Sequence, residues 1–353
     1  MMNTLQSIGY PIYFEDTLAE LVNFIRNGKY SRFFILTDEH TGKHCLPLVR
    51  EYIDGLETFD VIEINSGEEN KNIDFCIGIW KLLIDYGADR QSLLINLGGG
   101  VISDMGGFAA STFKRGIDFV HIPTTLLSQV DASVGGKTGI DLDNIKNIIG
   151  TFTQPKAVFI EHEFLQTLPA RQILSGLAEM LKHGLIADAA YWNELKYSNL
   201  DSPSAALVYY SIQIKNKVVI ADPHEKGIRK SLNFGHTVGH AIETYSLMND
   251  KNPLTHGEAI AAGMICEAKL SVMKTGLNED ELNEITEVIN GLYPKYPFNK
   301  DIYETLYSIM LKDKKNQSGR INASLLTQIG DCRIDNICTE EELYESLDYY
   351  RSL

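Results

Sequence analysis

The sequence lacks long hydrophobic runs, and it contains little cysteine. Its longest apolar stretches, such as residues 259–266 (AIAAGMIC), are far shorter than the ~20 residues that span a bilayer. The five cysteines form no CxxC pair, which argues against a disulfide framework. The N-terminal residues contain no basic segment followed by an apolar run, so we expect no secretory signal and a cytoplasmic location.

Positive charge is also scarce. The 353 residues contain 32 Lys and Arg against 47 Asp and Glu, which gives a formal net charge of −15. A chain of this charge is a poor match for nucleic acid or an anionic membrane surface, and we expect neither partner. An anionic small-molecule substrate remains compatible, provided that its site is locally basic.

No complete nucleotide-binding motif is present, and no internal repeat is visible. Residues 135–138 (GGKT) resemble the end of a P-loop, but Asp131 occupies the position where GxxxxGK[ST] requires its first glycine. This mismatch excludes a P-loop nucleotide triphosphatase. A loop of small residues that presents Lys137 remains.

The first half of the sequence alternates strand-like and helix-like segments. Helices are expected at 18–26 and 71–87, and short apolar strands at 32–37, 59–65, 92–97 and 119–123. Such alternation is typical of a parallel sheet with helices on both faces. Ligands bind these sheets at the carboxyl ends of the strands.

One glycine-rich segment follows the third of these strands. The segment Gly98–Asp104 (GGGVISD) suits the close approach of a dinucleotide pyrophosphate, although a glycine triplet alone also fits a tight turn. Arg115, Lys137 and Lys146 lie in or near Gly- and Thr-rich loops. In an acidic chain such cations indicate a phosphate or carboxylate ligand, and the alternative is that they are simply solvated.

Helical periodicity replaces the alternating pattern from about residue 165. We therefore divide the chain into 1–160, an α/β domain, and 161–353, an all-α domain. The apolar helix at 174–186 contains Glu179 and Lys182 on one face. An unpaired buried carboxylate is costly, so Glu179 is either a metal ligand or one half of an ordinary pair on an exposed edge.

The residues Arg229–Glu243 (RKSLNFGHTVGHAIE) concentrate polar side chains at three- and four-residue steps. If this stretch is one helix, Arg229, Asn233, His236 and His240 lie on one face. His256 follows shortly afterwards. Three histidines in a short segment favour a metal site, zinc above all, over a solvated polar stripe.

Taken together, these motifs resemble the 3-dehydroquinate synthase family of sugar phosphate cyclases. The resemblance is carried by GGGVISD, IPTTLLSQVDASVGGKT at 122–138, GLAEMLK at 176–182, RKSLNFGHTVGHAIE and HGE at 256–258. It implies a Rossmann-like NAD-binding domain, followed by an α-helical domain that binds metal and substrate. It also implies a homodimer.

The resemblance assigns site residues one by one. The metal, Zn²⁺ or Co²⁺, is assigned to Glu179, His236 and His256, and His240 is given to the substrate instead. NAD is assigned to Asp38, Glu68, Lys71, Gly99, Gly100, Val101, Asp104, Thr124, Thr125, Lys137, Lys146, Phe164 and Thr167. Substrate and catalysis are assigned to Asp131, Lys137, Lys146, Asn147, Lys182, Lys215, Arg229, Asn233 and His240, with Lys315 or Lys314 closing the site and Arg115 reaching the neighbouring subunit.

The implied reaction converts 3-deoxy-D-arabino-heptulosonate 7-phosphate into 3-dehydroquinate and phosphate. It proceeds by transient oxidation, β-elimination of phosphate, reduction and intramolecular aldol cyclisation, and it belongs to the shikimate pathway of aromatic amino acid biosynthesis. Two enzyme alternatives remain: another sugar phosphate cyclase, or a metal-dependent NAD polyol dehydrogenase of the glycerol dehydrogenase type. A binding protein without activity is disfavoured because all three assigned metal ligands are present.

Overall fold

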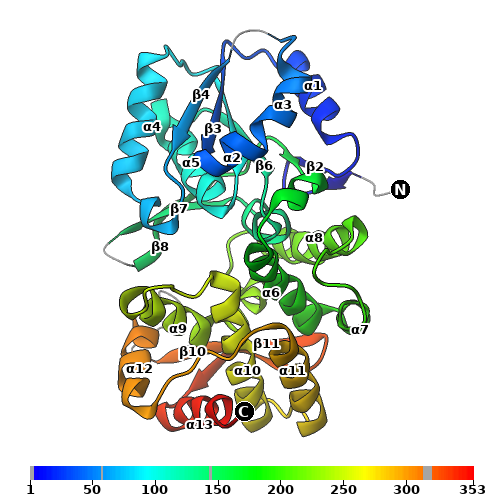
Figure 1. Cartoon of the computed structure of the whole chain (residues 1–353), viewed down its shortest axis with the longest axis vertical. Helices are drawn as coiled ribbons and strands as arrows, with labels where there is room; N and C mark the ends of the chain where they lie inside the picture. Colours follow the sequence, from blue (N-terminus) through cyan, green and yellow to red (C-terminus); the bar gives the residue numbers. More distant parts are fainter. Residues whose placement is uncertain (1–3, 57–58, 143–144, 313–319) are drawn as a thin grey trace. The chain divides into compact units, whose positions relative to one another are not determined.

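The computed structural model describes residues 4–56, 59–142, 145–312 and 320–353. The chain divides into two compact units, Met1–Pro169 and Ala170–Leu353 (Figure 1). The sequence-based division at 160/161 falls directly after strand β9. Among the described residues no helix is both long and apolar enough to cross a bilayer.

The first unit has the alternating order that the sequence predicts. Helices, strands and the short 3₁₀ or π turns labelled η follow one another as β1 Leu5–Gln6, β2 Pro11–Tyr13, α1 Thr17–Asn27, β3 Phe33–Asp38, α2 Glu39–His44, α3 Leu46–Ile53, β4 Asp60–Ile64, η1 Glu68–Asn70, α4 Ile73–Asp85, β5 Leu93–Gly98, α5 Gly100–Thr112, η2 Phe113–Arg115, β6 Asp118–Pro123, η3 Ser128–Ala132, β7 Lys137–Leu142, β8 Ile145–Phe152, β9 Val158–Phe159 and η4 His162–Thr167.

Seven strands of this unit form one sheet in the order β1-β2-β9-β6-β5-β3-β4. The four strands predicted from the sequence are confirmed as β3, β4, β5 and β6, and they pair in parallel. Alternate residues of β3 serve opposite faces: Phe33 and Ile35 pack with α1 and α3, whereas Phe34 and Leu36 pack with α4 and α5. Because β3, β4, β5 and β6 run in parallel, their carboxyl ends lie along the same edge of the sheet.

The second unit is mainly helical. Its elements are α6 Ala170–Ala187, α7 Ala189–Lys196, α8 Ala205–Ala221, η5 Ile228–Asn233, α9 His236–Asn249, α10 His256–Lys274, α11 Glu279–Leu292, η6 Lys300–Ile302, α12 Tyr303–Leu311, β10 Ile321–Gln328, β11 Asp331–Cys338 and α13 Glu340–Ser352. The central helix is α10, which packs against α6, α9, α11 and α13.

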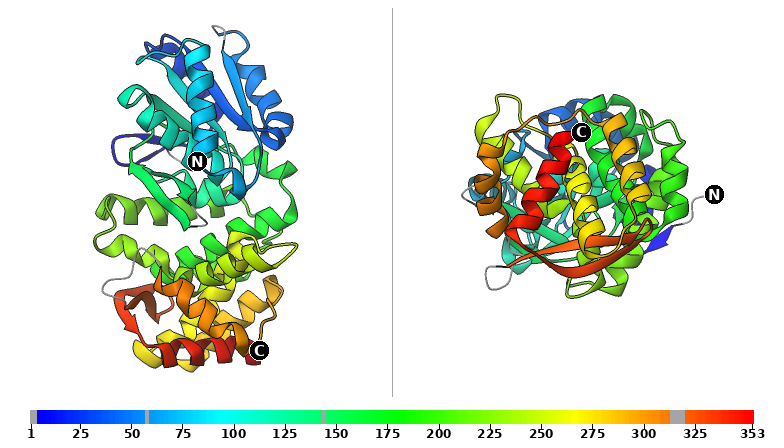
Figure 2. Two further views of the ribbon diagram at one scale, coloured as in Figure 1. Left: turned by 90° about the vertical axis from the view of Figure 1, so that its left-hand side faces the viewer. Right: turned by 90° about the horizontal axis from the view of Figure 1, so that it is seen from below.

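Two antiparallel hairpins were absent from the sequence-based prediction. The first pairs β7 with β8, and the second pairs β10 with β11. The second hairpin packs against α10 and α6 and is seen in orange and red in Figure 2. The helical prediction for the second unit is therefore confirmed in its main elements but omits this hairpin.

Candidate functional site

The stretch Arg229–Glu243 is not one helix, so the prediction of a single polar face is wrong. Arg229 and Asn233 belong to η5, and α9 begins only at His236. Between them Gly235 adopts a φ of 80°, a left-handed conformation that glycine adopts without strain and that interrupts any helix. Only the histidines share α9.

Three imidazole rings nevertheless form one cluster in the second unit. His236 and His240 come from the first turns of α9, and His256 is the first residue of α10. The ring centroids of His236 lie 5.0 Å from His240 and 5.5 Å from His256. A nitrogen from each of the three rings lies within 4.8 Å of the others.

Glycine lets α9 and α10 approach closely enough for this cluster. A Cβ on Gly263 would lie 2.0 Å from the carbonyl oxygen of Gly235 and 2.6 Å from the amide nitrogen of Gly239. Both atoms belong to the backbone, and backbone atoms cannot swing aside as a side chain can. Any larger residue at 263 would therefore separate the two helices.

Hydrogen bonds at Nδ1 set which ring nitrogens face inward. His236 Nδ1 lies 3.0 Å from the carbonyl oxygen of Phe234, and His256 Nδ1 lies 3.3 Å from Glu243 Oε2. Both partners are acceptors, so each Nδ1 carries a proton, and Nε2 is the nitrogen left to face Glu179. The two Nε2 atoms lie 3.5 Å and 3.7 Å from Glu179 Oε1.

The Glu179 carboxylate is fully buried on α6. Its Oε2 accepts a hydrogen bond from the equally buried Lys182 ammonium, whereas its Oε1 has no hydrogen-bond partner among the described residues. Burial alone would raise the pKa of Glu179, but Lys182, His236 and His256 hold it well below its usual value. The alternative of a Glu–Lys pair on an exposed edge is therefore wrong, because both side chains are in the interior.

The two imidazoles differ in protonation. Burial and the Lys182 charge lower the pKa of His236 well below its usual value, which keeps that ring neutral. Burial also opposes the charge on His256, but the carboxylates of Glu243 and Glu179 outweigh it and raise the pKa of His256 to about 9. The metal-free cluster consequently contains one neutral ring and one that is charged at neutral pH.

Three further sequence-predicted residues of the second unit lie near its interior. Lys215 on α8 and Arg229 on η5 are both buried, and an Nη1 of Arg229 donates to the carbonyl oxygen of Pro223 at 2.7 Å. Asn233 Nδ2 donates to Glu225 Oε1 at 2.9 Å. The segment before η5 therefore fixes the orientation of Arg229 and Asn233.

The cofactor residues predicted in the first unit follow the strands of its parallel sheet. Asp38 ends β3, where it also caps α2 by accepting the Thr41 amide at 2.8 Å. Glycines follow β5 and threonines follow β6, so all of them lie at the carboxyl edge. They are Gly99, Gly100, Thr124 and Thr125, with Val101 and Asp104 in the first turns of α5 and with Phe164 and Thr167 in η4.

Lys71 connects the predicted cofactor residues with the predicted substrate residues. Its buried ammonium donates to Asp104 Oδ2 and to Asn147 Oδ1, each at 2.7 Å. Lys146 Nζ lies 3.4 Å from Glu68 Oε1. Burial opposes the charge on Lys71, but Asp104 and Glu68 outweigh it and raise its pKa. These five residues form one polar cluster within the first unit.

Lys137 does not lie in a loop, as the sequence suggested, and Asp131 lies in a short helical turn. Asp131 belongs to η3, a single π-helical turn, and Lys137 is the exposed first residue of β7. Gly136 precedes it with a φ of 66°. Lys314 and Lys315 lie outside the described residues.

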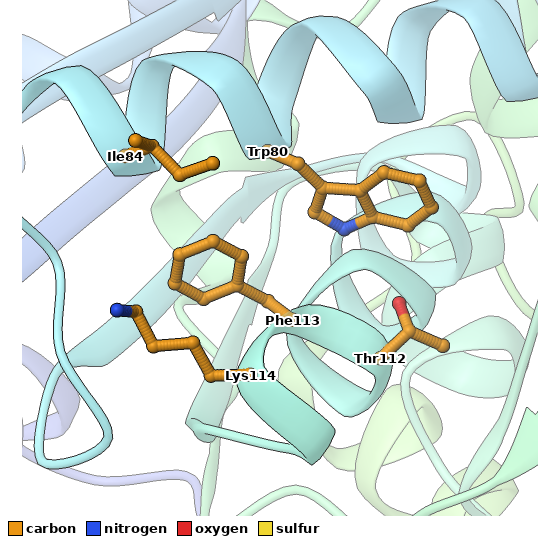
Figure 3. Close-up of a pocket in the computed structure, with 5 residues that line it drawn as sticks. All are labelled: Trp80, Ile84, Thr112, Phe113 and Lys114. Atoms are coloured by element: carbon orange, nitrogen blue, oxygen red, sulfur yellow. The ribbon is translucent and has the colours of Figure 1, made fainter.

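Arg115 lies in a turn with unusual backbone geometry. Lys114, Arg115 and Gly116 have φ values of 49°, 72° and 114°, and a run of left-handed residues is costly outside glycine. Phe113 anchors this turn because its side chain is buried in the core, and Figure 3 shows its ring lining a hollow together with Trp80 and Ile84 of α4. The anchored turn leaves Arg115 exposed at the surface.

Sequence reasoning missed two carboxylates that support these residues. Glu243 is the last residue of the histidine stretch, seven positions after His236, and that helical spacing was a usable indication. Glu225 has no comparable indication, because its φ of 56° belongs to an irregular segment. Both carboxylates contact a side chain predicted to be functional.

Comparison with known proteins identifies the family. The model of the 3-dehydroquinate synthase N-terminal region matches residues 61–175, and that of the C-terminal region matches residues 176–316. This chain belongs to the 3-dehydroquinate synthase family. A member from Parabacteroides distasonis, named 3-dehydroquinate synthase, is 44% identical over 341 residues, which is 96% of each chain. The chain is thus an enzyme of this family, and the dehydroquinate interpretation is favoured over the alternatives.

Solved structures support the same fold class. A 2-epi-5-epi-valiolone synthase from Streptomyces hygroscopicus, with NAD⁺ and Zn²⁺ bound, has a TM-score of 0.86 at 25% identity and covers 100% of this chain and 99% of its own. A 2-deoxy-scyllo-inosose synthase, complexed with carbaglucose-6-phosphate, NAD⁺ and Co²⁺, has a TM-score of 0.86 at 24% identity and covers 99% and 100%. Both share the fold of this chain.

Proposed function

We propose that this chain converts 3-deoxy-D-arabino-heptulosonate 7-phosphate into 3-dehydroquinate and phosphate, using NAD and a Zn²⁺ or Co²⁺ ion. The observation that carries the proposal is the buried Glu179 Oε1, which faces two imidazole Nε2 atoms within a member of this family. Such an oxygen is costly in a protein interior unless a cation satisfies it.

The distances between these atoms fit a tetrahedral ion. Bonds of about 2.0–2.1 Å at tetrahedral angles place neighbouring ligand atoms about 3.4 Å apart. The separations from Glu179 Oε1 are 3.5 Å and 3.7 Å. Two imidazoles and one carboxylate also match catalytic zinc sites, which leave a position open for water or substrate. Glu179, His236 and His256 would therefore hold the metal, with His240 beside it.

The first unit offers a fitting place for NAD. Helix α5 begins at Gly100 after the N-cap Gly99, which provides no side-chain cap, so the amides of its first turn can meet a pyrophosphate. Asp38, Gly99, Gly100, Thr124 and Thr125, five of the residues assigned to NAD, lie at the carboxyl ends of the parallel strands, where dinucleotides bind. The Lys71 ammonium is held in a fixed position by Asp104.

When bound, the two cofactors supply reversible oxidation and Lewis-acid polarisation of the substrate oxygens. The chain itself positions the anionic groups of the substrate. Lys182, Lys215 and Arg229 are buried cations in an acidic protein, and a substrate with a carboxylate and a phosphate supplies matching negative charge. Holding both groups fixes the carbon between them for proton loss and phosphate departure.

A homodimer completes the proposal. The strained, anchored turn at Lys114–Gly116 presents Arg115 outward, where it would bind the substrate phosphate in a second copy. An arginine fork suits a phosphate better than a lysine does. The remaining residues assigned to the substrate by resemblance are Asp131, Lys137, Lys146 and Asn147.

The direct test follows phosphate release from 3-deoxy-D-arabino-heptulosonate 7-phosphate. The purified protein is assayed with NAD, without NAD, and after chelation followed by metal addition. We expect release that requires both cofactors, formation of 3-dehydroquinate and no net NADH. NADH accumulating with simple polyols would instead indicate a dehydrogenase, and release only from other sugar phosphates would indicate a different cyclase.

Metal binding should depend on pH in a defined direction. The pKa of His256 is about 9 in the metal-free chain, so below that pH the ion must displace a proton. The metal dissociation constant should increase about tenfold for each pH unit lost below 9, because one proton is released per ion. Competition titrations with a chelator from pH 6.5 to 9.5 measure this slope.

Glu243→Gln provides the contrast for that titration. The variant removes the carboxylate that raises the pKa of His256, so the pH dependence should begin at a lower pH. A wild-type affinity that stays constant between pH 7 and 9 would contradict the ligand role of His256.

A further inference from the structure

Helix α9 is capped from another helix. Its N-cap residue, Gly235, has no side chain that could accept the free amides of the first turn. Glu267, a fully buried residue of α10, accepts the Gly235 amide at Oε2 (2.8 Å) and the Val238 amide at Oε1 (3.0 Å). One carboxylate therefore satisfies the N-cap and the N3 amides together.

Other helices of the same unit share this task between two local side chains. Thr255 with Glu258 at α10, and Thr339 with Glu342 at α13, form ordinary capping boxes. At α9 a single residue, Glu267, accepts both amides, and it lies 32 positions from Gly235 in the sequence. The negative charge also lies at the end of the helix where the backbone dipoles favour it. The cap thus fixes α9 to α10 as well as closing its first turn.

His236 lies between the two anchored amides. Its ring is held through Nδ1 by the Phe234 carbonyl, which is only one residue before Gly235. The helix that carries Glu267 also carries His256 at its first position. We infer that Glu267 is a positioning residue that holds His236 in place relative to His256. The inference rests on the metal site proposed above.

Glu267→Gln tests this role. An amide has one acceptor oxygen and a donating NH₂ group, so it can satisfy only one of the two backbone amides. We expect the visible absorption of the bound Co²⁺ to change in position and intensity, and the Co²⁺ dissociation constant to rise roughly 10- to 100-fold. Glu267→Asp keeps the charge but shortens the side chain, and we expect the same spectral change from it.

Glu342→Gln is the matched control, because it weakens a helix cap by the same substitution in the same unit. It should lower Tm without changing the Co²⁺ spectrum or affinity. If both Glu267 variants bind Co²⁺ with the wild-type spectrum and affinity, or if Glu342→Gln changes them equally, the inference is overturned. A wild-type protein that binds no Co²⁺ overturns the proposed metal site, and this inference with it.

Discussion

Glu179→Gln is expected to remove activity and to lower the free energy of unfolding by about 3–5 kcal/mol. The Lys182 ammonium is 1% exposed and donates to the carboxylate that this change neutralises. An uncompensated buried ammonium explains the loss of stability. The same substitution removes the anionic ligand of the proposed ion, which explains the loss of activity.

A double variant separates these two effects. Replacing both Glu179 and Lys182 with Met removes both charges of this buried pair, and apolar replacements of buried ion pairs are often neutral or stabilising. We expect urea unfolding to show most of the lost stability restored, while metal content and phosphate release stay absent. A double variant that regained metal-dependent activity would contradict the role given to Glu179.

Gly263→Ala is expected to be the second severe change. Its new Cβ would lie 2.0 Å from the Gly235 carbonyl oxygen, so α9 and α10 must separate. Overpacking against backbone should cost about 3 kcal/mol. Because the separation moves His236 away from His256, metal affinity should fall as well. Thermal or urea unfolding and a metal titration measure the two consequences.

Gly291→Ala is the control for that substitution. Gly291 lies in α11 of the same unit, and a Cβ there meets no atom within 4 Å. Alanine is the better helix former, so this variant should gain about 0.5–1 kcal/mol and keep its metal. If the two alanine variants had equal stability and equal metal affinity, close packing between α9 and α10 would not be what forms the site.

Much of the fold was predictable because its pattern is local. Apolar runs such as residues 92–97 between polar turns indicate buried strands, and their alternation with helices indicates a parallel sheet. The need of Glu179 for an interaction partner was also predictable, since a lone carboxylate within an apolar helix is costly to bury. The hairpins β7–β8 and β10–β11 were missed because their apolar alternation is interrupted, as at Gly139 and Gly150.

The features that the sequence did not predict depend on contacts between helices or strands, and residue spacing within one element contains no information about such contacts. The histidine stretch has helical spacing throughout, yet Gly235 divides it, and a single glycine is compatible with either outcome. Glu267 lies on a different helix from the amides that it caps. The burial of Lys182 is likewise decided by the helices packed around α6 rather than by its neighbours in sequence.

Metal content of two histidine variants tests the ligand set most directly. The rings of His236, His240 and His256 lie close enough together to hold an ion without Glu179, whereas we assign the ion to Glu179, His236 and His256. We therefore expect His240→Ala to retain about one ion per chain while losing activity, and His256→Ala to lose the ion. A metal-free His240→Ala protein, or a fully loaded His256→Ala protein, would contradict this assignment.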